Sequence, residues 1–120
     1  PHQFKAAVLE ATGGSWSHLR QTAILSALSD DEFNAVNPMN HLDSWRDIPV
    51  IAFHSRHDSW IPYETESEFI QAIKEQASHP QEIEFVSFDR TGAPDEHMGF
   101  GRESAFVKEI QLDFLARYLL

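Results

Sequence analysis

The sequence predicts an α/β fold in three layers, with a parallel sheet of about three strands and helices on both faces. Short apolar runs alternate along the chain with longer stretches that have helical periodicity. The run Pro49–Phe53 is apolar at every position, as expected for a strand that helices cover on both sides. Such an alternation of strands and helices indicates right-handed crossover connections between parallel strands.

The first strand is expected over Phe4–Ala11, an apolar run that ends where Gly13 and Gly14 allow a sharp turn. Helical spacing then predicts a first helix, and its apolar positions are Leu19, Ala23, Ile24, Ala27 and Leu28.

A second helix is expected to begin at Ser29. The hydroxyl of Ser29 and the carboxylate of Glu32 fit a capping box, in which each satisfies a free backbone N–H. Pro38 restricts the residue before it and should end this helix at Asn37. Residues 37–47 are expected to form a loop that Leu42 and Trp45 anchor.

The second half of the chain predicts helix, strand and helix. A helix after Pro62 has an apolar stripe of Phe69, Ile70, Ile73 and Ala77. Its acidic first turn suits the positive end of the helix dipole. A strand is expected over Ile83–Phe88. The last helix has apolar residues at spacings of one, three and four, namely Phe106, Val107, Ile110, Phe114, Leu115 and Tyr118.

Length and composition narrow the classes of protein. A chain of 120 residues forms one domain, here residues 1–120, and has a net charge of −10. That charge repels nucleic acid and anionic membranes, so neither is an expected partner. The absence of cysteine excludes disulfides, thiolate catalysis and cysteine-based metal sites, and it fits a cytoplasmic protein. No apolar run is long enough to span a membrane.

Two polar residues follow consecutive strands and are the main candidates for chemistry. Asp58 lies in the turn after the strand at residues 49–53, and His97 lies in the loop after the strand at residues 83–88. The carboxyl ends of parallel strands meet at one edge of a sheet, where ligands bind. A carboxylate there can accept the Nδ1 proton of an imidazole and leave Nε2 as a base. The alternative is a turn aspartate and a solvated loop histidine.

Two stretches of the sequence resemble the α/β-hydrolase superfamily, in particular its esterase-like and dienelactone-hydrolase-like members. Ile48–Pro62 resembles the family's apolar strand, His-Gly and catalytic aspartate, followed by Val-Pro. Glu96–Phe100 resembles the family's catalytic-histidine loop. The similarity covers nearly the whole chain and corresponds to the last three strands of the family fold.

This resemblance implies that Asp58 is the acid and His97 the base of a Ser-Asp-His triad, and that residues 15–47 occupy the place of a lid-like helical insertion. It implies the C-terminal portion of a serine hydrolase, acting on a small carboxylic-ester-like substrate without a cofactor. The sequence departs from the family in two ways. It contains no Gly-x-Ser-x-Gly nucleophile elbow, which in the family lies before residue 1, and Ser55 replaces a glycine.

The missing serine leaves a second function open. The chain is then a non-catalytic fragment or module that associates with another chain through an exposed sheet edge, either a missing N-terminal half or a second copy. In both cases the chain alone is expected to turn over no substrate.

Other residues compete for a role near this site. Asp89, Asp95 and Glu96 are rival acids, but they lie in the same loop as His97 and are expected to serve as caps or solvated charges. His54 and His57 suggest a metal site, but no recognised ligand spacing supports one, so no metal is expected.

Ser15 follows a strand on a tight turn, and a polar loop or N-cap role is expected for it rather than that of a nucleophile. Five large side chains are candidates either for a substrate pocket or for the core, namely Trp16, Trp45, Trp60, Met98 and Phe100. Of these, Trp60, Met98 and Phe100 flank the proposed pair and are the ones expected to bind substrate.

Overall fold

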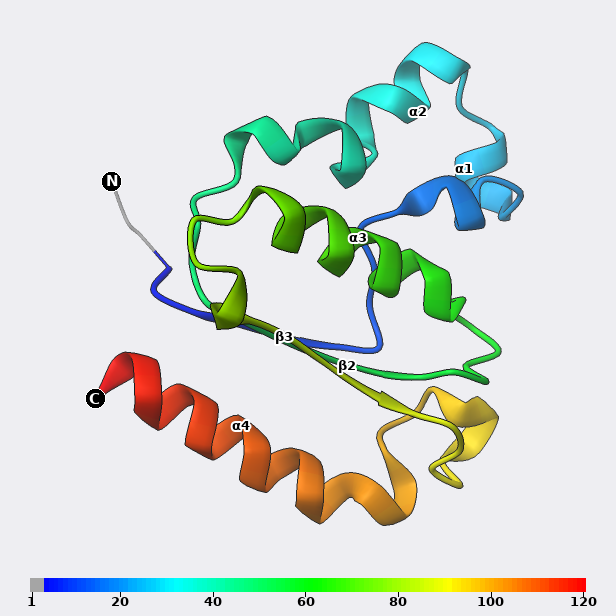
Figure 1. Ribbon diagram of the computed structural model, residues 1–120. Coiled ribbons are helices and arrows are strands. Elements are labelled where there is room, and N and C mark those ends of the chain that lie inside the picture. The colour runs from blue at the N-terminus through cyan, green and yellow to red at the C-terminus, as the bar shows by residue number, and fades with distance from the viewer. Residues whose placement is uncertain (1–3) are drawn as a thin grey trace.

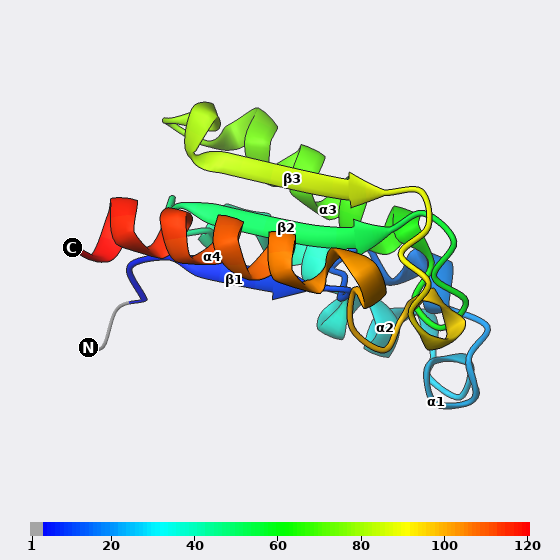
Figure 2. The ribbon, with the colours of Figure 1, turned by 90° about the horizontal axis from the view of Figure 1, so that it is seen from below.

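The computed structural model describes residues 4–120. Its sheet has three parallel strands in the order β1-β2-β3, namely β1 (Ala7–Glu10), β2 (Val50–Ser55) and β3 (Ile83–Phe88). Helix α3 (Tyr63–Gln76) covers one face of the sheet and α4 (Ser104–Leu119) covers the other (Figures 1 and 2). The predicted three-layer α/β fold with a parallel sheet is therefore confirmed.

The central strand β2 divides the hydrophobic core in two. All six of its residues are buried. Because successive side chains of a strand point to opposite faces, Val50 and Ala52 pack with Ile70 and Ile73 of α3. On the other face Ile51 and Phe53 pack with α4, whose most buried residues are Val107 and Phe114. This double burial explains why the strand is apolar at every position.

The strands and long helices lie close to their predicted positions. β3 has the predicted bounds, whereas β1 is shorter than Phe4–Ala11, and β2 continues beyond Phe53 to Ser55. Helix α3 begins directly after Pro62, with Glu64 and Glu66 in its first turn. In α4 the predicted stripe is mostly covered, but Phe106 is half exposed, and its ring contacts that of Phe88.

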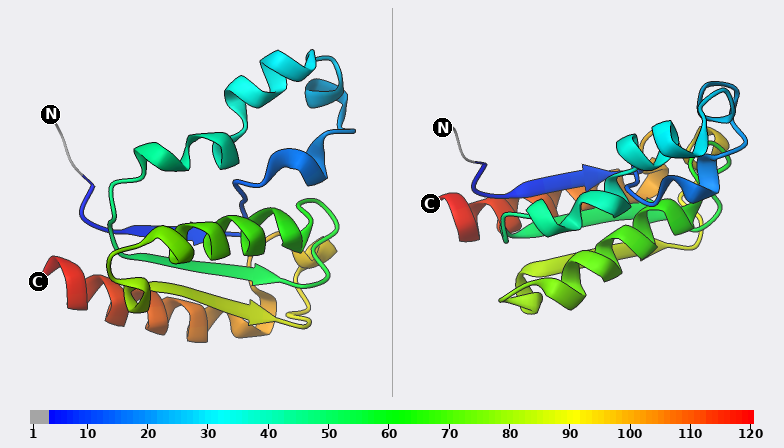
Figure 3. Two further views of the ribbon diagram at one scale, coloured as in Figure 1. Left: turned by 45° about the horizontal axis from the view of Figure 1, so that its top comes forward. Right: turned by 90° about the horizontal axis from the view of Figure 1, so that it is seen from above.

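The segment 15–47 leaves the end of β1, passes beside α3 and returns to the start of β2 (Figure 3). It contains four short helical pieces, which are η1 (Trp16–Leu19), α1 (Ala23–Ser26), α2 (Asp30–Val36) and η2 (Pro38–Ser44). The predicted capping box at the start of α2 is confirmed, since Ser29 and Glu32 bond each other's backbone N–H groups at 3.2 and 2.8 Å.

Two predictions for this segment need correction. The single helix from Leu19 to Leu28 is wrong, because the chain forms only the one-turn helix α1 there and Ile24 is 80% exposed. The guanidinium of Arg20 reaches the carbonyl oxygens of Leu25 and Leu28, so these carbonyls are satisfied without a continued helix. Residues 37–47 are not a plain loop but include η2, although Leu42 and Trp45 do pack against the core as expected.

Candidate active site

Asp58 and His97 are in direct contact at the carboxyl ends of β2 and β3. The Nδ1 atom of His97 lies 2.8 Å from Oδ2 of Asp58, within hydrogen-bonding distance. The Asp58 side chain is fully buried, whereas that of His97 is 21% exposed. The predicted contact between the two side chains is confirmed, and it leaves Nε2 of His97 directed away from the carboxylate.

The Asp58 carboxylate is held by its own turn. Its Oδ1 atom accepts the backbone N–H groups of Trp60 and Ile61, both at 2.8 Å. An aspartate that bonds the backbone two and three residues further on closes a compact turn and fixes its own rotamer. One oxygen is therefore used for the turn, and the other faces His97.

The loop that carries His97 is braced by Glu96. This carboxylate accepts the backbone N–H groups of Thr91 and Gly92, both at 2.7 Å, and the hydroxyl of Ser55 at 2.6 Å. Partial burial raises the pKa of Glu96, but the hydrogen bonds from Ser55, Thr91 and Gly92 outweigh it and lower the pKa to about 2. The contacts hold Glu96 in a left-handed backbone conformation, with φ of 53°.

None of the rival acids bonds His97. Asp89 lies 3.2 Å from Nε2 of His57 on the surface. Asp95 accepts the indole N–H of Trp60 at 3.1 Å, and its backbone carbonyl accepts the N–H of Ser59 at 3.0 Å. Asp89 and Asp95 thus make surface and loop contacts, whereas Glu96 differs from the expected cap or solvated charge, because it braces the loop of His97.

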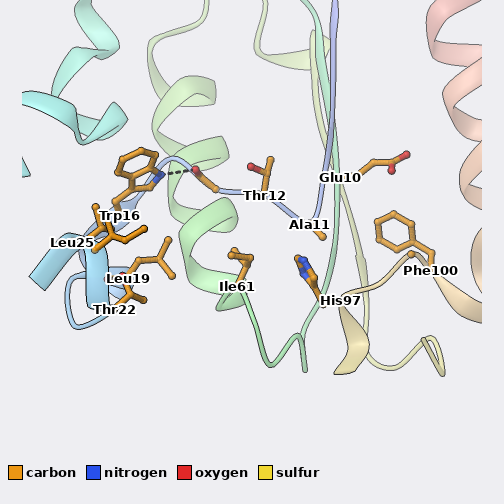
Figure 4. Close-up of a pocket in the computed structure, with 13 residues that line it drawn as sticks. Glu10, Ala11, Thr12, Trp16, Leu19, Thr22, Leu25, Ile61, His97 and Phe100 are labelled. Carbon is orange, nitrogen blue, oxygen red and sulfur yellow. Dashed lines mark hydrogen bonds between the residues drawn. The ribbon is translucent and has the colours of Figure 1, made fainter. Parts of the chain in front are cut away.

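A pocket of about 650 Å³ opens beside His97. Figure 4 shows His97 and Ile61 between two walls, one with Trp16, Leu19, Thr22 and Leu25, and the other with Glu10 and Phe100. The first wall comes from the segment 15–47, so this segment borders the pocket. The remaining lining residues are small or apolar, and they are Ala11, Thr12, Gly13, Ile24 and Gly99.

The three residues predicted to bind substrate have different surroundings. Phe100 lines the pocket but is 5% exposed, because it also belongs to the core beneath α4. Trp60 is 55% exposed and stacks on the imidazole of His97, with ring centroids 4.9 Å apart and an interplanar angle of 23°. Met98 is 58% exposed and does not line this pocket. The structure thus brings Phe100 to the pocket and Trp60 to the histidine ring.

A second histidine and a glutamate lie behind Asp58. His54 and Glu66 are both fully buried, and Nδ1 of His54 lies 2.5 Å from Oε2 of Glu66. The other ring nitrogen, Nε2, lies 2.9 Å from the carbonyl oxygen of Ile61 and 3.3 Å from Oδ2 of Asp58. The sequence suggested His54 as a metal ligand and as the histidine of the family's His-Gly pattern, and it gave Glu66 only as a polar residue of the helix after Pro62. A histidine inside an apolar strand was the available signal, because a buried polar side chain requires a partner.

The described residues provide no nucleophile for His97. Ser15 is buried and its hydroxyl donates to Glu68 at 2.7 Å, in agreement with a polar loop role. No serine hydroxyl within residues 4–120 is hydrogen-bonded to His97, whose ring has one hydrogen bond there, the one to Asp58. This part of the chain also contains no group of three or more acidic, histidine or cysteine side chains arranged to hold a metal ion.

No protein-family model, no curated protein and no solved structure matches this chain. Within residues 4–120, none of the helices combines the length and the apolar character that crossing a bilayer requires.

Proposed function

We propose that this chain is the C-terminal part of a serine hydrolase and supplies the acid and base of its triad, with the nucleophilic serine brought by other polypeptide. The observation that carries the proposal is the 2.8 Å contact between Nδ1 of His97 and the buried carboxylate of Asp58. The site also has an accessible imidazole beside a pocket, which a purely structural Asp–His pair would not need.

The mechanism follows from the positions of the protons. Asp58 accepts the Nδ1–H of His97, fixes the tautomer and stabilises the imidazolium that forms during the reaction. Nε2 of His97 then takes the proton of the serine hydroxyl as that oxygen attacks the ester carbonyl, and returns the proton to the leaving alcohol. In the second half of the reaction, Nε2 takes a proton from the water that attacks the acyl-enzyme carbonyl, and it gives that proton to the serine oxygen as the bond to the acyl group breaks and the acid leaves.

Trp60 supports this role through its stacking on His97. The indole covers one face of the imidazole, and its own N–H is held by Asp95. Stacking on an aromatic ring limits rotation of the imidazole. Trp60 therefore acts on the histidine rather than on the substrate.

The lining of the pocket favours esters of neutral, apolar groups. Leu19, Leu25 and Ile61 line it, and Glu10 is its one carboxylate. None of the lining residues is a lysine or an arginine, so a substrate carboxylate would find no cationic partner and would be repelled by Glu10. We therefore propose a carboxylic ester with an aliphatic or aromatic group as substrate, and a cytoplasmic location, which the absence of cysteine favours.

A second candidate function is a non-catalytic module that binds another chain through its sheet edge. β1 pairs with β2, and within residues 4–120 no strand pairs with its other edge, so the backbone N–H and C=O groups there can pair with another strand. Sedimentation over a range of concentrations tests this candidate. A monomer at every concentration would contradict self-association.

The first test of the hydrolase proposal uses the 120-residue chain alone. It is incubated with a fluorophosphonate probe, which labels only serines that a base has activated. We expect no labelling, because no serine in the described residues bonds His97. Labelling of any serine in this chain would show that the nucleophile is not supplied by other polypeptide.

The second test uses the complete gene product and a short-chain aryl ester. His97→Ala should lower kcat by on the order of 10⁴-fold or more, and Asp58→Asn by about 10⁴-fold. His57→Ala is the matched control, because His57 lies in the same turn as Asp58 but its ring points to Asp89 on the surface, at 3.2 Å. Full activity of the His97→Ala protein would overturn the triad assignment.

A further inference from the structure

The buried pair of His54 and Glu66 lies directly beneath the turn that presents Asp58. His54 is on β2 and Glu66 is in the first turn of α3. The imidazole bridges Glu66 on one side and the carbonyl oxygen of Ile61 on the other, at 2.5 and 2.9 Å. Neither the proposed reaction nor the fold requires a titratable pair here, since an apolar pair could fill the same space.

The hydrogen-bond partners of His54 determine the position of one of its ring protons. Its Nε2 atom faces two oxygens that can only accept, the carbonyl of Ile61 at 2.9 Å and Oδ2 of Asp58 at 3.3 Å. A bare nitrogen lone pair would repel both oxygens. Nε2 of His54 therefore carries a hydrogen, which it donates to the Ile61 carbonyl.

A second proton lies between Nδ1 of His54 and the carboxyl group of Glu66. Either Nδ1 of His54 donates to an ionised carboxylate, or a neutral carboxyl donates to Nδ1, and both arrangements leave the pair with no net charge. Burial lowers the pKa of His54, but the bonds to Glu66 and Ile61 and the charges of Glu66 and Asp58 outweigh it and raise the pKa. Within the described residues Oε1 of Glu66 has no hydrogen-bond partner, and burial raises the pKa of this carboxyl, although His54 and the backbone of Thr12 oppose the rise.

This proton arrangement connects the pair to the candidate triad through the backbone. The Nε2–H of His54 holds the carbonyl of Ile61, and the N–H of the same residue donates to Oδ1 of Asp58 at 2.8 Å. The turn from Asp58 to Ile61 is thus fixed from both sides, from within by the aspartate and from beneath by His54. Its orientation in turn fixes where Oδ2 meets His97.

We propose that His54 and Glu66 form a positioning pair, in which Glu66 orients the His54 ring so that its Nε2–H anchors the Asp58 turn and thereby the Asp58–His97 hydrogen bond. The catalytic meaning of this pair rests on the proposed function. The contacts that link Glu66, His54, Ile61 and Asp58 do not depend on the proposed function, and measurements without substrate test them.

The decisive experiment compares two double variants that differ at residue 54, where one has no hydrogen-bond donor and the other has one. His54→Phe with Glu66→Leu fills the space with apolar atoms and removes the donor, and it avoids a lone buried charge. His54→Gln with Glu66→Leu is the matched control, because the glutamine amide can replace the Nε2–H toward the Ile61 carbonyl. Two NMR signals are followed, the Nδ1 proton of His97 and the exchange rate of the Ile61 amide.

The Phe-containing variant should lose the His97 Nδ1 proton signal and show faster exchange of the Ile61 amide, whereas the Gln-containing variant should keep both. The amide of Val86 in β3 reports whether the sheet itself is intact. If both variants keep the signals, or both lose them to the same extent, the donor of His54 does not position Asp58 and the proposal is overturned.

A measurement on the unmodified chain covers the case in which the variants do not fold. The ¹⁵N shifts of the His54 ring at neutral pH should show Nε2 protonated and its proton protected from solvent. A bare Nε2 would overturn the proposal. These outcomes are distinct from failure of the hydrolase proposal, which the fluorophosphonate and ester experiments detect.

Discussion

Both carboxylate oxygens of Asp58 have polar contacts. Oδ1 takes two backbone N–H groups, and Oδ2 faces His97 and His54. A carboxylate with this many donors is strongly constrained in position, since bonds to a charged acceptor are shorter and stronger than neutral ones. This arrangement suits a residue that must orient another one.

We expect Asp58→Asn to destabilise the chain. The amide is isosteric, but if its oxygen keeps the bonds to the turn, its NH₂ group faces the N–H groups of two imidazoles. The free energy of unfolding should fall by about 1–3 kcal/mol, the usual effect of an unsatisfied buried polar group. Urea unfolding measures this fall, with the exposed Asp43→Asn as control. Equal loss in both variants would contradict the constrained role of Asp58.

The lowered pKa of Glu96 predicts how the free energy of unfolding should change at acidic pH. Its pKa is lowered from 4.5 to about 2 in the folded chain, so its contribution is complete above about pH 4.5 and is lost as the pH falls toward 2. Glu96→Gln should lower the free energy of unfolding by roughly 1–3 kcal/mol at neutral pH, because the amide cannot accept all the donors from Ser55, Thr91 and Gly92. The difference from the original chain should shrink as the pH is lowered through that range.

The measurement is urea unfolding at several pH values. Glu64→Gln is the matched control, because Glu64 is an exposed glutamate in the first turn of α3. A difference that does not depend on pH would show that the Glu96 carboxylate braces the loop by its shape rather than by its charge.

At the scale of elements, the connection from β3 to α4 determines where His97 lies. Gly99 and Gly101 both have left-handed φ angles, of 89° and 49°. Alanine at Gly99 would meet no heavy atom within 4 Å, whereas the Cβ of alanine at Gly101 would lie 2.3 Å from the carbonyl oxygen of Thr91. Only Gly101 is therefore required by close packing of two backbone segments.

This contrast predicts different effects for two similar substitutions. Gly99→Ala should cost about 1–2 kcal/mol, the strain of a left-handed alanine. Gly101→Ala should cost clearly more, because the Thr91 segment and the start of α4 must also move apart. Thermal or urea unfolding of the two variants tests the order. A larger effect at Gly99 would contradict the close approach at Gly101.

The elements that the sequence predicted well are those whose pattern is local. Strand β3, helix α3 and the capping box at Ser29 follow from apolar periodicity and from one pair of residues. The helix expected from Leu19 did not form, because its end depends on Arg20 reaching carbonyls further along the chain. Periodicity carries no information about such a contact.

The candidate site likewise has features that the sequence predicts and features that depend on contacts between distant residues. The contact between Asp58 and His97 was predictable, because the ends of neighbouring parallel strands must meet at one edge. The roles of His54 and Glu66 were not, because their 2.5 Å contact joins a strand to the helix that covers it. Trp60 was placed near the site, but only the folded turn determines that its ring lies on His97 and not in the pocket.

At the scale of the whole molecule, the excess of acidic residues should oppose folding. The chain has 19 acidic and 9 basic side chains. Repulsion among like charges destabilises the compact state and is screened by salt, with a Debye length of about 10 Å at 0.1 M. We expect the free energy of unfolding to rise as sodium chloride is increased from low concentration to about 0.5 M. A fall would show that attraction within ion pairs such as Arg117–Glu84 outweighs the repulsion.

The order β1-β2-β3 repeats the order of synthesis, so each strand can pair with one already made. The cover for Ile51 and Phe53, however, comes from the last element of the chain, α4. During synthesis, before α4 has left the ribosome, the face of the sheet with Ile51 and Phe53 would be exposed, and chaperones could bind this apolar surface. A chain ending at Glu103 should accordingly bind the dye ANS far more strongly than the 120-residue chain.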